Sequence, residues 1–458
     1  MTRRLINFIL AVIISGTSAV AAKSVTRVWE APDAMINPEL ARRSSIIKIS
    51  KVEFKPQETV VYVTAMHYPG AKLKFSKEVC LSADGVDYPV ISTEGMQPGK
   101  SHFFPSDGRK EYVFHFQPLP AATESFDFIE SRSENECLFT GVMDRGTQLQ
   151  SSNWRDDATG DWVIGFMPDF AIYDSKVWKY DSKDFERGRF VITDGDRSLS
   201  VEAGKEKDGV RNLKIGDRKL KASRISGMTL GFYPDAGAVS EFADNGYRAG
   251  DSVRISGCLV NRPADMREIT VMVDNLIDDD LVYAAEIDSL GCFSLTFPVD
   301  NTQTVMFDWK NMNISLPVEP GEKYFFFGDL SNPQRLWMGA KSRLANELMM
   351  FDLSKWLSLN GISPSGEMVK MFTDYNADRA RVVDSIAAAN PTLSPLWGEW
   401  QKQWGLQQTA FHGGQSRFRS PGRVLTPEIK EYLETAVRPA LKDPLGAWNP
   451  SMLAAFYT

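Results

Sequence analysis

The chain has 458 residues, which suggests about three domains at roughly 100–200 residues per domain. Apolar residues make up 43% and charged residues 24%, as in folded proteins, so wholesale disorder is excluded. The formal net charge is −7 and the pI is about 5.4. These values argue against a nucleic-acid-binding protein, because such proteins normally present a basic surface.

Residues 1–22 have the features of a secretory signal peptide. Arg3 and Arg4 supply positive charge, residues 5–14 form an almost unbroken apolar run, and small residues at 19–22 provide a cleavage site. The run is too short to span a membrane, and the alternative is a buried N-terminal helix. The segment carries two arginines and no acidic residue, so its removal changes the net charge from −7 to −9. We expect an exported protein with no transmembrane segment after cleavage.

Export affects how the four cysteines are interpreted, because disulfides persist outside the cytosol. The four residues are Cys80, Cys137, Cys258 and Cys292, and they allow three pairings. We favour the pairs Cys80–Cys137 and Cys258–Cys292, since each then lies within one β-rich segment. Each bridge would contribute roughly 3–4 kcal/mol in the chain-entropy model. The alternative is four separate buried thiols.

Residues up to about 332 show the pattern of short antiparallel strands. Tyr112, Phe114 and Phe116 alternate with residues of the opposite face, and turn signals such as Asp84-Gly85 recur between the strands. We therefore predict consecutive antiparallel β-sandwich (Ig-like) domains. The predicted units are an Ig-like β-sandwich domain at 23–145, a small β domain at 146–240 and a second β-sandwich domain at 241–332. Within the small domain, Asp194-Gly195 is expected to turn a hairpin.

Residues 333–458 change to a helical period and form the predicted C-terminal helical region. Trp397, Trp400 and Trp404 follow helical spacing, and Thr426 followed by Pro427 predicts a helix start. We interpret the apolar stripes as core faces. Residues 412–423, with three arginines and three glycines, are expected to form an exposed linker. The predicted fold class is thus mainly β followed by α.

Motifs that would indicate catalysis or metal binding are absent from the sequence. The four histidines are far apart, and no nucleophile elbow or phosphate loop is present. The acidic runs at 156–157 and 278–280 are better explained as turns than as calcium ligands. We therefore predict no catalytic, cofactor-binding or metal-binding residue. Trp154, Trp162 and Trp178 could stack on sugars if exposed, but core packing is the favoured interpretation.

Soft patterns of turns and aromatic residues carry a family resemblance over most of residues 25–450. The stretches are Pro69-Gly70, Asp84 to Tyr88, Phe116 to Pro120, Phe126 to Glu130, Trp162 to Gly165, Ala171 to Trp178, Pro320 to Glu322 and Gly339 to Leu348. The chain resembles the N-terminal part of TlpA-like thiol–disulfide oxidoreductases of Gram-negative envelopes. In that family, β domains and a helical segment precede a thioredoxin-like domain. The resemblance implies a location in the periplasm or cell envelope of a Gram-negative bacterium.

The sequence departs from this family at the residues that carry the chemistry. The family's reaction uses a Cys-x-x-Cys motif at a helix start, where the helix dipole activates the first thiol. No such motif occurs in the sequence, so no catalytic residue can be transferred. The family's order of domains would place it beyond Thr458. We expect a truncated reading frame, a separately encoded redox domain or a natural short paralogue.

Two classes of function follow from these observations. The preferred hypothesis is a non-catalytic envelope module that binds or positions a protein partner or substrate for a thioredoxin-like domain absent from this chain. The alternative is a carbohydrate- or cell-wall-binding protein. A glycoside hydrolase is a weaker option, because paired carboxylates in β-sandwich enzymes cannot be recognised from sequence.

Overall fold

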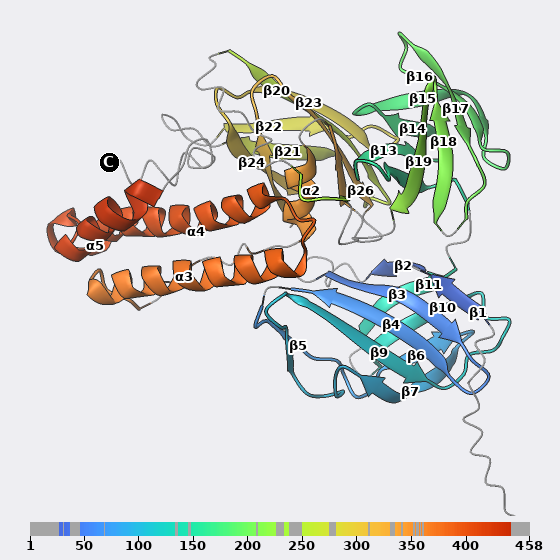
Figure 1. Ribbon diagram of the computed structural model, residues 1–458, viewed down its shortest axis with the longest axis horizontal. Helices are drawn as coiled ribbons and strands as arrows, with labels where there is room; N and C mark the ends of the chain where they lie inside the picture. Colours follow the sequence, from blue (N-terminus) through green and yellow to red (C-terminus); the bar gives the residue numbers. More distant parts are fainter. Residues whose placement is uncertain are drawn as a thin grey trace, which may run out of the picture.

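The computed structural model describes the chain from residue 27 to residue 440, with gaps. The described ranges are 27–30, 32–36, 46–67, 69–132, 136–144, 148–207, 209–225, 233–237, 250–273, 281–309, 312–329, 335–339, 342–350, 353, 357, 359 and 361–440. The predicted signal peptide and the acidic run 278–280 lie outside them. Three β units precede the helices, and most strand pairs are antiparallel (Figure 1). The predicted fold class, mainly β followed by α, is confirmed.

The first unit, here called the first sandwich, consists of one nine-stranded sheet folded over on itself and a separate two-stranded sheet. Its strands are β1 (Arg27–Glu30), β2 (Asp33–Ile36), β3 (Ile46–Phe54), β4 (Thr59–Met66), β5 (Lys72–Leu73), β6 (Cys80–Ala83), β7 (Val86–Glu94), β8 (His102–Phe103), β9 (Arg109–Phe116), β10 (Ser125–Ser131) and β11 (Glu136–Met143). The sheet order is β1-β3-β4-β9-β7-β6-β10-β11-β2. The first half of β7 pairs with β6 and its second half with β9, and the change occurs after Pro89. The strand therefore belongs to both layers.

Aromatic residues fill the space between the two layers of the first sandwich. Tyr112, Phe114 and Phe116 are buried on one face of β9, as the alternating pattern predicts. Phe114 and Phe116 both meet Phe128 of β10 edge-on, with ring centroids 5.2 and 5.6 Å apart. Such edge-to-face pairs contribute beyond their buried area.

The second unit is a closed antiparallel barrel. Its strands are β12 (Ser152–Asp156), β13 (Trp162–Phe166), β14 (Phe170–Tyr173), β15 (Lys176–Asp184), β16 (Arg189–Thr193), β17 (Ser198–Ala203), β18 (Val210–Ile215) and β19 (Arg218–Ile225). Each strand pairs with the next, and β19 pairs back with β12. The hairpin predicted around Asp194-Gly195 joins β16 to β17. Closure leaves no free sheet edge and encloses Trp154, Trp178 and their neighbours.

The third unit, the second sandwich, consists of two four-stranded sheets with an apolar core between them. Its strands are β20 (Ser252–Val260), β21 (Glu268–Val273), β22 (Leu281–Glu286), β23 (Cys292–Pro298), β24 (Gln303–Trp309), β25 (Met312–Val318), β26 (Lys323–Asp329) and β27 (Arg335–Met338). One sheet has the order β23-β20-β26-β27 and the other β22-β21-β24-β25. The pair β20–β26 is parallel, in contrast to its neighbours.

Helices form the C-terminal part of the described chain. They are α2 (Ser342–Met350), α3 (Gly366–Ala389), α4 (Pro395–Gln415), the 3₁₀ turns η1 (Ser416–Arg419) and η2 (Pro421–Arg423), α5 (Pro427–Tyr432), the π turn η3 (Leu433–Val437) and the 3₁₀ turn η4 (Arg438–Ala440). Figure 1 shows α3 and α4 as an antiparallel pair. Within the described residues, no helix combines the length and apolar character needed to cross a membrane.

The expectation of an exposed linker at 412–423 is wrong for residues 412–417, which are buried or half-buried, whereas residues 418–419 and 421–423 are exposed. Residues 412–415 continue α4, and 3₁₀ turns follow. Gly413 and Gly414 are buried in α4, and a Cβ atom on Gly413 would lie 2.9 Å from Leu433 Cδ2. These glycines therefore permit a close approach of the chain rather than marking a flexible break.

A shared apolar cluster, the junction core, joins the barrel, the second sandwich and the helices. Trp162 of β13 lies 6.1 and 6.0 Å from Phe325 and Phe327 of β26, measured between ring centroids. Trp397 and Ile386 contribute from α4 and α3. The tryptophan stripe predicted on the helix is thus a core face, and it fixes the helices against the β units.

Candidate functional site

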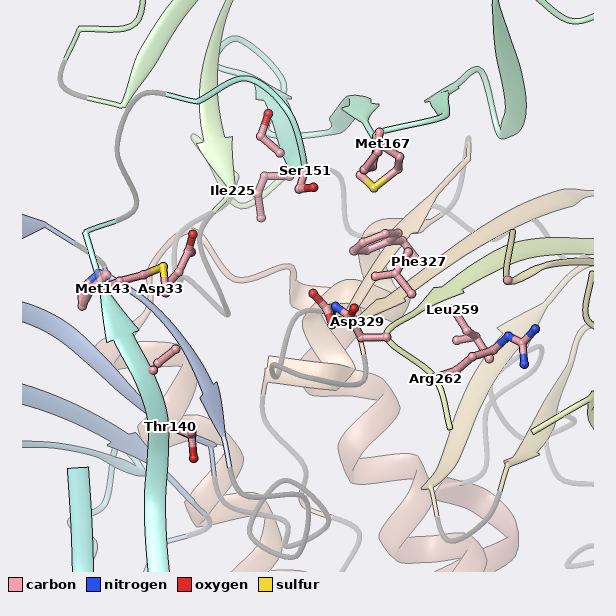
Figure 2. A pocket seen from close by; sticks show the side chains of 18 of the residues that line it. Asp33, Thr140, Met143, Ser151, Met167, Ile225, Leu259, Arg262, Phe327 and Asp329 are labelled. Atoms are coloured by element: carbon pink, nitrogen blue, oxygen red, sulfur yellow. Dashed lines mark hydrogen bonds between the residues drawn. The ribbon is translucent and has the colours of Figure 1, made fainter. Parts of the chain in front are cut away.

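A cavity of about 820 Å³ lies where the first sandwich, the barrel and the second sandwich meet. Figure 2 shows side chains from all three units around it. The residues labelled there are Asp33, Thr140 and Met143 of the first sandwich, Ser151, Met167 and Ile225 of the barrel, and Leu259, Arg262, Phe327 and Asp329 of the second sandwich. This volume is in the range of small-molecule sites, which commonly form where domains meet.

Two segments of the cavity wall have left-handed backbone at residues other than glycine. Ser151 has φ 56° and precedes β12, and Asn261 has φ 53° and follows β20. Such positions cost roughly 1–2 kcal/mol, less for asparagine, and they occur often at functional sites. The Asn261 side chain donates a hydrogen bond to Asp329 Oδ1 at 2.9 Å. The wall of the second sandwich is therefore held in one conformation by its own side chains.

Lys48 lines the cavity from strand β3 of the first sandwich. Its neighbours Ile47 and Ile49 are buried in the sandwich core, so strand alternation directs Lys48 to the opposite face. Burial, followed by repulsion from Arg109, lowers the pKa of Lys48 from 10.5 to about 8. Among the residues that the structure describes, none places a carboxylate within ion-pair distance of its ammonium group. Lys48 is therefore a cationic group of the wall whose charge is not balanced by a described carboxylate within ion-pair distance.

The barrel rim next to the cavity contains a buried charged cluster. Arg211 and Arg224 each lie 3.4 Å from the carboxylate of Glu206, and both guanidinium groups stack against Trp154. Burial lowers the pKa of Arg211, and the nearby Glu206 carboxylate opposes this effect. Arg224 also donates to the backbone carbonyl of Gln148 and lines the cavity. The cluster thereby fixes the rim on which the cavity depends.

The disulfide Cys258–Cys292 lies directly behind the cavity wall. The two residues are paired across β20 and β23, with Cα atoms 4.1 Å apart. Residues 259–262 and 289–291, which follow and precede the two cysteines, line the cavity. The bridge thus ties together the two segments that form this wall.

The other two cysteines lie on either side of β10. Cys80 of β6 and Cys137 of β11 both pair with Ile129. Two strand spacings amount to about 10 Å, whereas a disulfide spans Cα atoms less than about 7 Å apart. This register does not bring Cys80 and Cys137 within disulfide range.

The tryptophans considered as sugar-stacking residues are buried. Trp154 and Trp178 lie inside the barrel and Trp162 lies in the junction core. Their indole N–H groups donate to Ser152 Oγ, the carbonyl of Tyr173 and the carbonyl of Ile164, respectively. Core packing is therefore the correct interpretation of these three residues.

The remaining sequence candidates are structural within the described residues. His115 lies on β9 between the carboxylates of Glu58 and Glu94, at 3.1 and 3.2 Å. Asp156 accepts from Arg218 at 2.6 Å and from the backbone of Ala158, as expected for a turn. Across the described ranges, no group of three or more His, Cys, Asp or Glu residues has a geometry that could hold a metal ion.

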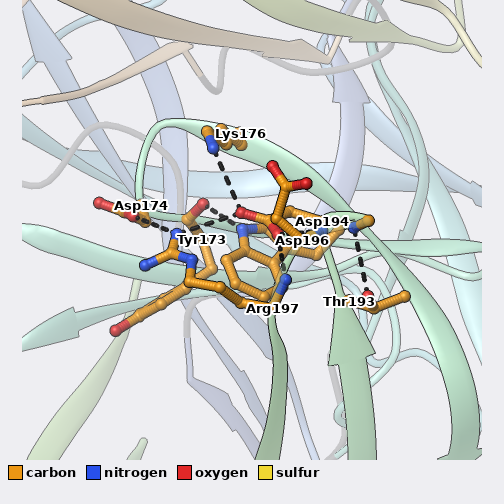
Figure 3. A network of polar contacts seen from close by, with 9 residues as sticks. Tyr173, Asp174, Lys176, Thr193, Asp194, Asp196 and Arg197 are labelled. Carbon is orange, nitrogen blue, oxygen red and sulfur yellow. Dashed lines mark hydrogen bonds and ion pairs between the residues drawn. The ribbon is translucent and has the colours of Figure 1, made fainter.

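A second polar cluster lies at the turns of the barrel (Figure 3). Asp194 accepts hydrogen bonds from Lys176 and from the backbone and side chain of Arg197, which also contacts Asp174. Desolvation raises the pKa of Asp194, but these hydrogen bonds outweigh it and hold the pKa well below its ordinary value. Arg197 stacks on Trp178 with its guanidinium carbon 5.2 Å from the ring centroid. The cluster joins the β14–β15 and β16–β17 turns and has a structural role.

The cavity was not predicted from the sequence, because it is formed by residues from three separate units. The only local indication was a lysine between two buried isoleucines, which is equally typical of a solvent-facing strand position. No protein-family model matches the chain, and no curated protein matches it.

Proposed function

We propose that this protein is an exported, non-catalytic binding module of the cell envelope, with its binding site in the junction cavity. The observation that carries the proposal is the cavity itself, because three units contribute to its wall and its volume suits a small molecule or a partner's side chains. As the family resemblance implies, such a module would hold a partner or substrate for a thioredoxin-like domain. The buried positions of Trp154, Trp162 and Trp178 give the carbohydrate alternative no support.

A cavity-blocking variant tests the proposal. Thr140 is exposed on β11 at the cavity wall, so T140W is expected to fill part of the space without disturbing a core. Thr296 is exposed on β23 and does not line the cavity, so T296W is the matched control. Ligands recovered with the protein from the envelope, detected by native mass spectrometry, should disappear in T140W and persist in T296W. Equal recovery in both variants would contradict a site in this cavity.

Absence of catalysis is tested separately. The purified chain should show no disulfide reductase activity in an insulin-turbidity assay, because the sequence lacks the Cys-x-x-Cys motif. Activity that is lost on alkylation of the four cysteines would overturn the non-catalytic part of the proposal.

A further inference from the structure

The charges around the cavity are unequally compensated. The charged residues on its wall are Asp33, Lys48, Asp169, Arg224, Arg262 and Asp329. Asp33 and Asp169 are exposed, and Asp169 lies 3.5 Å from Lys183. Asp329 accepts a hydrogen bond from Asn261. The aspartates are thus solvated or partnered.

The cationic side chains of the wall are not all partnered in this way. Arg224 is paired with Glu206, and Arg262 donates to the backbone carbonyls of Met266 and Asp288. Lys48 is half-buried, and its charged neighbour on β9, Arg109, has the same sign. Partial loss of water around an ammonium group without an anionic partner is unfavourable, so an anion in the cavity would relieve this cost.

The uncharged part of the wall is mixed, with polar residues such as Thr140 and Ser151 and a group of apolar side chains. Met167, Phe170 and Ile225 contribute from the barrel, and Leu259 and Phe327 from the second sandwich. A water molecule occupies about 30 Å³, so an inorganic anion alone would leave most of the 820 Å³ unfilled. The surface favours a ligand with an apolar body next to its charged group.

We propose that the cavity binds a small amphipathic carboxylate, with its carboxylate at the Lys48 ammonium group and its apolar body against the barrel and second-sandwich walls. This inference rests on the proposed function, since it names the ligand class of the same cavity. A charge-assisted hydrogen bond in a partly desolvated site gives both affinity and orientation.

The experiment uses octanoate and its neutral counterpart 1-octanol, titrated calorimetrically into the full chain. K48M keeps the unbranched stem and removes the charge, and K214M is its control, because Lys214 lies on barrel strand β18 and does not line the cavity. We expect K48M to weaken octanoate binding at least about tenfold and K214M to leave it unchanged. Octanol should bind more weakly than octanoate and should be insensitive to K48M.

The outcomes separate the two proposals. If octanoate and octanol bind equally, K48M has no effect and T140W blocks both, the carboxylate inference is overturned and the cavity remains the binding site. If neither probe binds, the carboxylate inference is overturned, and the cavity site is judged by the ligands recovered with T140W and T296W. If both probes bind equally to T140W and T296W, the cavity site fails and this inference fails with it. A tenfold loss confined to octanoate in K48M, with the free protein still folded by circular dichroism, supports the inference.

The pH dependence provides a second readout. Because the pKa of Lys48 is about 8 in the unliganded protein, binding of the carboxylate should take up a proton when measured above that pH. Octanoate affinity should therefore fall between pH 7.5 and pH 9.5 in the wild type and stay flat in K48M. An equal fall in both proteins would overturn the role of Lys48.

Discussion

Removal of the Cys258–Cys292 bridge should destabilise the second sandwich selectively. The cysteines are separated by 34 residues, so the chain-entropy relation gives about 3.8 kcal/mol at 25 °C. Both cysteines belong to the second sandwich, and the barrel, Ser152–Ile225, contains no cysteine. Reduction should therefore lower the unfolding free energy of the second sandwich more than that of the barrel, which is coupled to it through the junction core.

Hydrogen exchange followed by mass spectrometry during urea unfolding resolves the units. With a urea dependence of about 1–3 kcal/mol per molar, peptides from β20 and β23 should unfold at least about 1 M earlier after reduction. The urea midpoints of barrel peptides should shift less than those of β20 and β23, because the bridge lies outside the barrel, which is coupled to the second sandwich through the junction core. The variant C258A/C292A should be insensitive to reductant, and a C80A/C137A background removes any contribution from the first sandwich. Unchanged midpoints for β20 and β23, or an equal shift in the barrel, would refute the reasoning.

Three further substitutions test the packing and the charges. R343M should lower the unfolding free energy by about 3–5 kcal/mol in urea titrations. The carboxylate of Glu347 is 1% exposed, and the substitution removes the Arg343 guanidinium that lies 3.0 Å from it. A loss below about 1 kcal/mol would contradict this prediction. G257A should cost about 1–3 kcal/mol, since its Cβ would lie 2.6 Å from the carbonyl oxygen of Phe326, and an unchanged melting temperature would be the contrary result. The wild type should gain stability relative to K48M as pH rises from 8 to 10.5. The reason is that Lys48 releases its proton near pH 8 in the folded protein but only near 10.5 in the unfolded chain. Denaturation curves of both proteins at pH 7.5 and pH 10 measure the difference in unfolding free energy, and a difference that does not change with pH would refute the prediction.

Features that depend on local spacing were predictable from the sequence. The alternation of Phe114 and Phe116 shows a strand with one buried face, and the spacing of Trp397, Trp400 and Trp404 shows a helix with one buried face. Such patterns arise because residues two apart in a strand, or three and four apart in a helix, lie on the same face. Fold class and many core residues could therefore be inferred.

Features that depend on distant pairing were not predictable. Barrel closure requires Trp154 to pair with Arg224, 70 residues later, and nothing in either strand indicates this partner. Lys48 becomes part of a site only because the barrel and the second sandwich cover its face of β3. The glycines at 413–414 suggest a break unless the position of Leu433 is known. In each case the deciding contact comes from another part of the chain.

Barrel closure also determines how this unit is connected to the rest of the protein. Since β12 and β19 are adjacent antiparallel strands, Asn153 near the start of the barrel is paired with Ile225 at its end. The chain thus arrives and departs about one strand spacing apart, at the rim that faces the cavity. The barrel is therefore an insertion between the two sandwiches whose first and last strands lie next to each other. One wall of the cavity can therefore be exchanged by grafting another barrel at these strands, while the chain path of the two sandwiches stays intact.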